Sequence, residues 1–158
     1  MTPTIVDADL SDPRLVRFLQ QHLEDMADTA PDESRHALNL SALTAPTVRL
    51  WVAEVGSAPA GTVALSRLEP DHVELKSMRT DPALRGRGIA TALLEHVMVE
   101  ARRWGAARIS LETGSAEFFA PARALYARHG FRECPPFGAY VADPHSVFMT
   151  RDLPGPRN

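Results

Sequence analysis

The hydrophobic positions of the N-terminal part predict a strand followed by two helices. Residues 4–6 form a short run typical of a first strand. Residues 13–26 repeat apolar side chains at helical spacing behind Ser11 or Asp12, either of which can cap a helix. Residues 31–45 are expected to form a second, shorter helix that continues into a loop.

The middle of the chain has three runs of β-branched and apolar residues, at 48–55, 61–68 and 73–80. Residues 56–60, Gly-Ser-Ala-Pro-Ala, separate the first two runs and predict a hairpin. A short polar segment, residues 69–71, leads to the third run. We therefore expect three consecutive antiparallel strands.

Helical and strand patterns alternate in the second half. Residues 89–105 repeat apolar side chains at helical spacing, and residues 108–113 alternate apolar and polar side chains as a strand does. Residues 121–129 begin with proline and are followed by glycine, the usual asymmetry of a helix. Residues 137–140 and 147–152 are expected to be late strands. This order predicts a mixed α/β fold.

The composition is that of one globular domain, which we expect to span residues 1–158. Hydrophobic residues make up 44% of the chain and charged residues 23%, values that exclude a disordered chain. Cys134 is the single cysteine, so no internal disulfide forms, and no Cys/His cluster has the spacing of a zinc site. The first residues lack the basic start and long apolar run of a signal peptide, and no window approaches ~18 apolar residues. We therefore expect a cytoplasmic protein without a membrane partner.

The charge is mildly acidic overall but unevenly distributed. A net charge of −3, from 17 basic and 20 acidic residues, argues against nucleic acid as the main partner. Residues 1–40 hold eight acidic and three basic side chains, whereas residues 79–88 hold three arginines and one aspartate. The second segment is therefore a short basic region in an acidic chain.

The basic region combines glycine and arginine at the start of a predicted helix. Its sequence is Arg85-Gly86-Arg87-Gly88-Ile89-Ala90. Glycines there let a ligand approach the backbone, and the N–H groups of the first helical turn attract an anion. A Walker loop requires a lysine after its second glycine, and a dinucleotide fingerprint requires glycine or alanine where Thr91 stands. Two interpretations remain, another phosphate or pyrophosphate site and a tight turn with solvated arginines.

Two motifs carry a family resemblance. Residues 74–82 lead into the loop, where Arg85, Gly88 and Ala90 fit one pattern, and residues 122–131 hold Leu125-Tyr126 followed by Gly130-Phe131. In this order and spacing they resemble the acetyl-CoA-binding core of the GNAT superfamily of N-acetyltransferases. The resemblance covers residues 73–131 well and the flanking segments by element order alone.

The resemblance implies a fold and a co-substrate. The fold is a mixed, mostly antiparallel sheet of six or seven strands, splayed at its centre and flanked by about four helices. The co-substrate is acetyl-CoA, with no metal. Its pyrophosphate would lie against the loop, and its pantetheine arm and thioester carbonyl against the bulged strand before the loop. The implied coenzyme-binding residues are Met78, Arg79, Thr80, Arg85, Gly86, Arg87, Gly88, Ile89 and Ala90.

The resemblance also implies an acid and a base, because an amine attacks the thioester directly. Tyr126 matches the family tyrosine near the coenzyme sulfur and is the expected acid, although a helical aromatic is otherwise a packing residue. Glu74 is the expected base, acting directly or through water, although a lone strand glutamate is otherwise a solvated residue, and Glu112 is the second candidate. Phe119 stands where many relatives have an asparagine that contacts the coenzyme.

The expected function is acetyl transfer from acetyl-CoA to a primary amine of a small molecule or peptide. The acidic N-terminal segment favours a cationic acceptor. Residues 135–150 are a candidate lining of the acceptor pocket or a hairpin with packed aromatic residues. The resemblance is compatible with a homodimer. The alternative from another class is a non-catalytic acyl-CoA sensor or interaction module on the same fold.

Overall fold

A seven-stranded sheet organises the structure, a computed structural model that describes residues 2–26 and 42–154. The strands are β1 (Thr4–Asp7), β2 (Val48–Val55), β3 (Ala58–Glu69), β4 (His72–Thr80), β5 (Arg108–Gly114), β6 (Arg132–Glu133) and β7 (Ser146–Asp152), in the spatial order β1-β2-β3-β4-β5-β7-β6. The helices are α1 (Pro13–Met26), α2 (Ile89–Arg103) and α3 (Ala120–Arg128), with short 3₁₀ turns η2 (Ala42–Thr44), η3 (Pro82–Leu84) and η4 (Glu117–Phe119). The predicted mixed fold is confirmed, with three α-helices in the described part where about four were expected.

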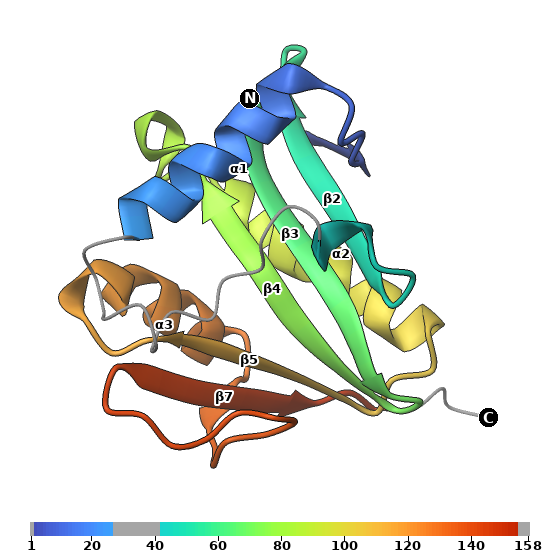
Figure 1. Cartoon of the computed structure of the whole chain (residues 1–158), viewed down its shortest axis with the longest axis vertical. Helices are drawn as coiled ribbons and strands as arrows, with labels where there is room; N and C mark the ends of the chain where they lie inside the picture. Colours follow the sequence, from blue (N-terminus) through green and yellow to red (C-terminus); the bar gives the residue numbers. More distant parts are fainter. Residues whose placement is uncertain (1, 27–41, 155–158) are drawn as a thin grey trace.

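Helix α1 covers one face of the sheet, and α2 lies behind the other face (Figure 1). Helix α1 begins at the predicted residue because the Asp12 carboxylate accepts a hydrogen bond from the Arg14 N–H at 2.9 Å. Its apolar side buries Leu15 and Leu19 in one cluster with Ala64 of β3. This smaller core marks the α1 face of the sheet.

The opposite face carries the larger core. Leu93 and Val97 of α2 are fully buried in one cluster with Val63 and Leu75 of the sheet, and Leu125 of α3 belongs to the same cluster. Burying each such side chain contributes about 1.5–3 kcal/mol. Neighbouring residues along β3 and β4 thus point alternately into the two cores.

The β2–β3 hairpin is tighter than predicted. Val55 pairs with Ala58, so the turn consists of Gly56 and Ser57, and β3 begins at Ala58 rather than at residue 61. Gly56 has a φ of +67°, which glycine adopts without strain. The strand includes Pro59, a residue that is unfavourable inside sheets, and this is why the sequence pattern predicts a longer loop.

The sheet opens between β4 and β5. Their parallel pairs run from His72 with Arg108 to Leu75 with Leu111 and end there. The two strands diverge beyond this point (Figure 1). The expected central splay is confirmed, and it leaves one edge of β4 without a neighbouring strand after Leu75.

A bulge at Ser77 interrupts the regular alternation of side chains along β4. Thr62 of β3 pairs with Arg79 and Ala64 pairs with Lys76, so two residues of β4 lie opposite one residue of β3. Ser77 has a φ of +54°, and its carbonyl accepts a hydrogen bond from Thr62 Oγ1 at 2.8 Å. The bulge therefore reverses which face the following side chains occupy.

The reversal sorts the side chains of β4 between the two faces. Lys76 pairs with Ala64, which is buried in the α1 core, whereas Thr80 pairs with Gly61, which lies against Ile89 and Leu93 of α2. The α1 face therefore receives Glu74, Lys76 and Arg79, and the α2 face receives Met78 and Thr80.

The predicted strand at residues 137–140 is wrong. The segment is a turn in which the Tyr140 N–H donates to the Phe137 carbonyl at 3.1 Å, with Gly138 at a φ of +59°. Pro135 and Pro136 precede it and lack the N–H groups that strand pairing uses. The strand that pairs with β7 at this position is β6.

The predicted helix at residues 31–45 lies mostly outside the described residues, and its described end is the 3₁₀ turn η2. Of the helices that the structure describes, none is long and apolar enough to cross a membrane.

Candidate active site

The glycine-rich loop presents backbone N–H groups at the start of α2. Gly88 caps the helix with a φ of +81°, and Gly86 has a φ of +78°, both in the left-handed region that favours glycine. Ala92 donates to the Gly88 carbonyl, so the N–H groups before it have no partner within the helix. Arg85 and Arg87 are exposed beside them. The loop can therefore bind an anion through its N–H groups, the helix dipole and two guanidinium groups.

The open edge of β4 leads directly to this loop. Asp81 caps the intervening turn η3 by accepting a hydrogen bond from the Ala83 N–H at 2.9 Å. Met78 packs against the α2 core, and Thr80 Oγ1 is buried without a partner among the residues that the structure describes. The edge and the loop thus fit the two parts of the implied coenzyme, an amide-bearing arm along an unpaired strand edge and a pyrophosphate at a helix start.

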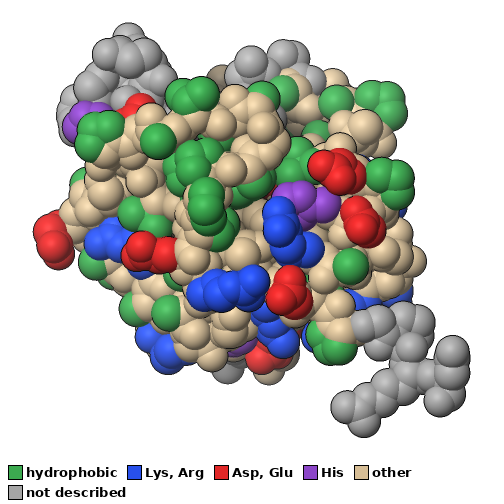
Figure 2. All heavy atoms as spheres, turned by 90° about the horizontal axis from the view of Figure 1, so that it is seen from below, with side chains coloured by type: hydrophobic (Ala, Val, Ile, Leu, Met, Phe, Trp, Pro, Cys, Tyr) green, Lys and Arg blue, Asp and Glu red, His purple; other side chains and the backbone are tan. Residues whose placement is uncertain are grey.

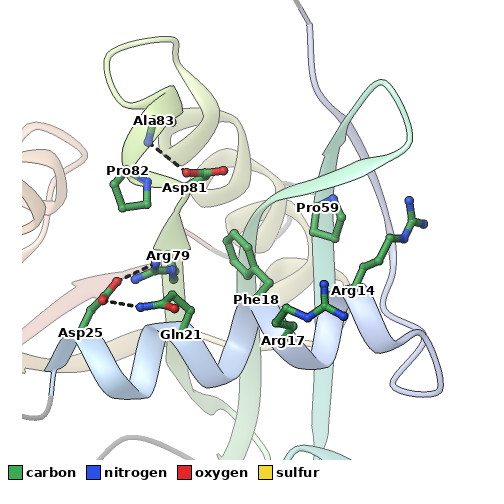
Figure 3. Close-up of a pocket in the computed structure, with 10 residues that line it drawn as sticks. All are labelled: Arg14, Arg17, Phe18, Gln21, Asp25, Pro59, Arg79, Asp81, Pro82 and Ala83. Atoms are coloured by element: carbon green, nitrogen blue, oxygen red, sulfur yellow. Dashed lines mark hydrogen bonds and ion pairs between the residues drawn. The ribbon is translucent and has the colours of Figure 1, made fainter.

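Arg79, one of the expected coenzyme-binding residues, directs its side chain away from this loop. It is 7% exposed and pairs with Asp25 of α1 at 2.7 Å, and it lies 3.4 Å from His22 Nδ1. Burial and the nearby guanidinium lower the pKa of His22 to about 4, so the ring is neutral near pH 7. Figure 3 shows Arg79 against Asp25 at one end of an open pocket of about 570 Å³ beside α1. The side chain therefore ties α1 to β4.

Glu74 lies on the α1 face at the beginning of the splay. It is 4% exposed. The Tyr140 hydroxyl donates to Glu74 Oε2 at 2.6 Å, and Lys76 Nζ donates to the same oxygen at 3.3 Å. Lys76 Nζ also donates to the Tyr140 oxygen at 3.1 Å. Both hydrogen bonds to the carboxylate end on Oε2, and Oε1 accepts none from the described residues.

Glu112 is a second carboxyl group at the same opening. It follows Leu111, the last residue of β5 that pairs with β4. Burial raises the pKa of Glu112 to about 7, and the negative charge of Glu74 contributes to the rise. The Glu112 carboxyl group therefore changes its protonation state near neutral pH.

Tyr126 lies on the other side of the sheet. It is 4% exposed within the α2 core, and its ring centroid is 5.7 Å from that of Phe131. Burial raises the pKa of Tyr126, which keeps the hydroxyl protonated. The structure thus places the two expected catalytic side chains, Tyr126 and Glu74, on opposite faces of the sheet.

The sequence reasoning missed the pairing of Lys76 and Tyr140 with Glu74. Side chains alternate along a strand, so the sequence alone indicates that Lys76, two residues after Glu74, lies on the same face. Tyr140 is 66 residues from Glu74 in the chain, and no local pattern shows such a contact. The aromatic residues of the 137–140 turn do pack together, with Phe137 and Tyr140 ring centroids 5.2 Å apart.

The described residues give little support for a metal site or a nucleophilic cysteine. Among residues 2–26 and 42–154, no three His, Cys, Asp or Glu side chains are grouped to hold a metal ion. Burial raises the pKa of the Cys134 thiol, the opposite of what a nucleophilic thiolate requires. The Phe119 ring packs so closely on Gly114 that a Cβ there would collide with it.

The sheet is mixed and splayed, and its central strand leads through a bulge to a glycine-rich loop that can bind an anion. The resemblance implied this arrangement for a coenzyme A-dependent acetyltransferase. The model of the acetyltransferase (GNAT) family matches residues 15–131. The chain belongs to this family and is an acetyltransferase.

Individual relatives agree with this assignment. The chain is 44% identical to the uncharacterised N-acetyltransferase YsnE of Bacillus subtilis, over 92% of this chain and 96% of that one. A crystal structure from Klebsiella pneumoniae, described as an acyl-CoA N-acyltransferase, matches with a TM-score of 0.80 and 30% identity, over 96% and 97% of the two chains. A GNAT acetyltransferase from Elizabethkingia anophelis, solved with acetyl-CoA bound, shares the fold, with a TM-score of 0.70, 18% identity, and coverage of 96% and 99%.

Proposed function

We propose that the protein transfers the acetyl group of acetyl-CoA to a primary amine of a small molecule or peptide, with Glu74 as base and Tyr126 as acid. The observation that carries the proposal is the buried Glu74 carboxylate, whose Oε2 holds two hydrogen bonds while Oε1 accepts none from the described residues. A base needs such an open oxygen within reach of the reacting nitrogen.

The coenzyme lies on the α2 side in this proposal and supplies the thioester that carries the acetyl group. The N–H groups of Arg85 through Ala90 hold its pyrophosphate, with Arg85 and Arg87 adding charge. The unpaired backbone of Met78 and Thr80 holds the arm and polarises the thioester carbonyl, a role in which one donor typically contributes ~10²-fold or more in rate. Arg79 contributes its backbone alone, because its side chain is bound to α1.

The acid and the base act from opposite sides of the splay. The acceptor nitrogen forms a bond to the acetyl carbon, and Glu74 Oε1 accepts the proton that this nitrogen loses. The Tyr126 hydroxyl donates a proton to the sulfur as the carbon–sulfur bond breaks. Its raised pKa keeps this proton available, and the location of Tyr126 in the α2 core matches the coenzyme side.

The acceptor approaches from the α1 face and carries positive charge in this proposal. The negative charges of Glu74 and Asp143 both raise the pKa of Glu112, and the positive charge of Lys76 lowers it. Steering by the acidic N-terminal segment stays a prediction. Among its acids, Asp25 is paired with Arg79, and Asp28, Asp32 and Glu33 lie outside the described residues.

Glu112 remains the second candidate base, favoured by one observation. Its pKa of about 7 is close to the value that suits a general base at neutral pH. If Glu112 were the base, the rate would rise with pH around a midpoint of about 7, and this rise would disappear in Glu112→Gln.

Two matched substitutions decide between the carboxylates. Glu74→Gln is expected to lower kcat by ~10²- to 10⁴-fold with an unchanged Kd for acetyl-CoA, because Gln keeps the shape but cannot accept the proton. Glu112→Gln makes the same chemical change one strand away and is expected to cost at least tenfold less in kcat. Thiol release and coenzyme titration measure both, and the reverse ranking would assign the base to Glu112.

The alternative of a non-catalytic sensor is not favoured. The family match and the N-acetyltransferase relative support an enzyme.

A further inference from the structure

We propose that Tyr140 and Lys76 form a clamp that fixes the Glu74 carboxylate through Oε2 and leaves Oε1 turned toward the acceptor. Tyr140 and Lys76 are thus positioning residues for the acetyl transfer. The inference rests on the proposed role of Glu74 as base, and its test separates the two.

The contacts form a closed triangle around one oxygen. Tyr140 and Lys76 both donate to Oε2, at 2.6 and 3.3 Å, and Lys76 donates to the Tyr140 oxygen at 3.1 Å. Because the Lys76 ammonium can only donate, the Tyr140 oxygen is the acceptor in that contact and its own proton points to Glu74. Charge-assisted hydrogen bonds of this kind are the strong ones, and they fix one oxygen of the carboxylate.

Packed aromatic rings hold Tyr140 in place. Its ring centroid lies 5.2 Å from that of Phe137 and 5.4 Å from that of Phe148 on β7. Lys76 Nζ lies 5.6 Å from the centre of the Tyr140 ring. The turn at residues 137–140 therefore positions a hydroxyl from the C-terminal part of the chain on a carboxylate of β4.

The cluster contains residue types that are rare in this chain. Lys76 is the single lysine in a sequence with 17 lysine and arginine residues. The two tyrosines are Tyr126 and Tyr140, one on each side of the splay. A spectroscopic signal from lysine therefore reports on this site alone. Substituting each tyrosine in turn separates the two sides of the splay.

The charges around Glu74 explain why a clamp is needed. The titratable groups nearest Glu74 on this side include His72 and Lys76 of β4, Glu112 of β5, and Tyr140 and Asp143 of the β6–β7 connection. Arg79 lies on the same face but is paired with Asp25 of α1. Burial lowers the pKa of His72, so this ring does not supply a positive charge near neutral pH. The carboxylates repel one another at Glu112, where the negative charges of Glu74 and Asp143 both raise the pKa. Among the described residues, Lys76 and Tyr140 are the two whose side chains donate hydrogen bonds to Glu74.

Tyr140→Phe tests the clamp, because it removes the hydroxyl and keeps the ring. The ionised Glu74 loses a donor, so the acidic limb of kcat/KM for the acceptor should move to higher pH by about one unit, a tenfold change in proton binding. The Kd for acetyl-CoA should change less than twofold. Lys76→Met should move the limb in the same direction. Tyr126→Phe removes the other tyrosine hydroxyl, on the coenzyme side, and should lower kcat while leaving the acidic limb in place.

Lysine labelling gives a readout that does not depend on turnover. A protein labelled with lysine carrying ¹³C at Cε alone has one such signal, from Lys76, and its chemical shift should change with pH at the midpoint of the acidic limb. In Tyr140→Phe this midpoint should move upward with the kinetic limb, and in Glu74→Gln it should disappear.

The outcomes distinguish the clamp from the base. An unmoved limb and an unmoved lysine midpoint in folded Tyr140→Phe would overturn the clamp while Glu74→Gln still abolishes turnover. Normal turnover in Glu74→Gln would instead overturn the assignment of the base. Glu74→Gln combined with Tyr140→Phe should be no slower than Glu74→Gln alone, because the clamp acts through Glu74.

Discussion

At the scale of single residues, two glutamates near the splay meet different surroundings. Glu74 is buried with an ammonium and a phenol hydroxyl on one oxygen, whereas Glu112 forms no ion pair with any residue of the described part. Desolvation, only partly offset by the positive charge of Lys76, raises the pKa of Glu112 to about 7. The same residue type therefore meets a built hydrogen-bond network at one position and a half-buried site with a raised pKa at the other.

Glu112→Gln should become more stabilising as the pH rises. Glu112 binds its proton at about pH 7 when folded and near 4.5 when unfolded. The folded state therefore holds more protons between these values, and wild-type stability falls as the pH rises through them. Glutamine has no such penalty. The free energy of unfolding of the variant, relative to wild type, should rise by about 1–3 kcal/mol between pH 5 and pH 8 in urea titrations. A difference that does not change with pH would contradict a buried neutral Glu112.

At the scale of elements, one bulge and one glycine-rich turn convert a strand and a helix into a site. The bulge at Ser77 directs Met78 and Thr80 to the α2 face, beside the loop. The turn then presents the N–H groups of α2 to an anion, which requires a left-handed conformation at Gly88. Both features depend on backbone geometry more than on side-chain chemistry.

Gly88→Ala should weaken coenzyme binding more than it weakens the fold. A Cβ at Gly88 meets no atom within 4 Å, so the cost comes from its φ of +81°, about 1–2 kcal/mol for a non-glycine residue. Gly56→Ala is the matched control, with a φ of +67° and equally open space in the β2–β3 hairpin, outside the glycine-rich loop. Both variants should lose similar stability in thermal melts, but the Kd for CoA should rise at least fivefold in Gly88→Ala alone. An equal Kd in both variants would contradict the loop as the coenzyme site.

The sequence predicted the regular elements of the fold and the local part of the site. α1 and β2 have the predicted bounds, because helical spacing and β-branched runs are local signals. The bulge was expected from the family resemblance, but its location at Ser77 and the resulting reversal of Arg79 have no sequence signal. The Tyr140–Glu74 contact depends on tertiary packing across 66 residues. The aromatic residues at 137 and 140 suggested a strand, and the neighbouring prolines prevented it.

At the scale of the whole molecule, the splay separates two chemical environments that meet at one point. The coenzyme loop and Tyr126 belong to the α2 side, and the carboxylates with Lys76 belong to the α1 side. On the face seen from below, basic, acidic and apolar side chains are interspersed, with no continuous basic area (Figure 2). Selectivity for an acceptor should depend on the groups at the splay, Glu74, Glu112 and Lys76.

Amine-dependent thiol release from acetyl-CoA tests the central claim most directly. Wild type and Tyr126→Phe are compared over a panel of cationic, neutral and anionic primary amines. We expect one thiol released per amine acetylated, with cationic amines preferred. Tyr126→Phe should have at least a tenfold lower kcat and an unchanged Kd for acetyl-CoA, because the leaving thiolate loses its proton donor. Binding of acetyl-CoA without thiol release for any amine, in both proteins alike, would contradict the proposed acetyl transfer.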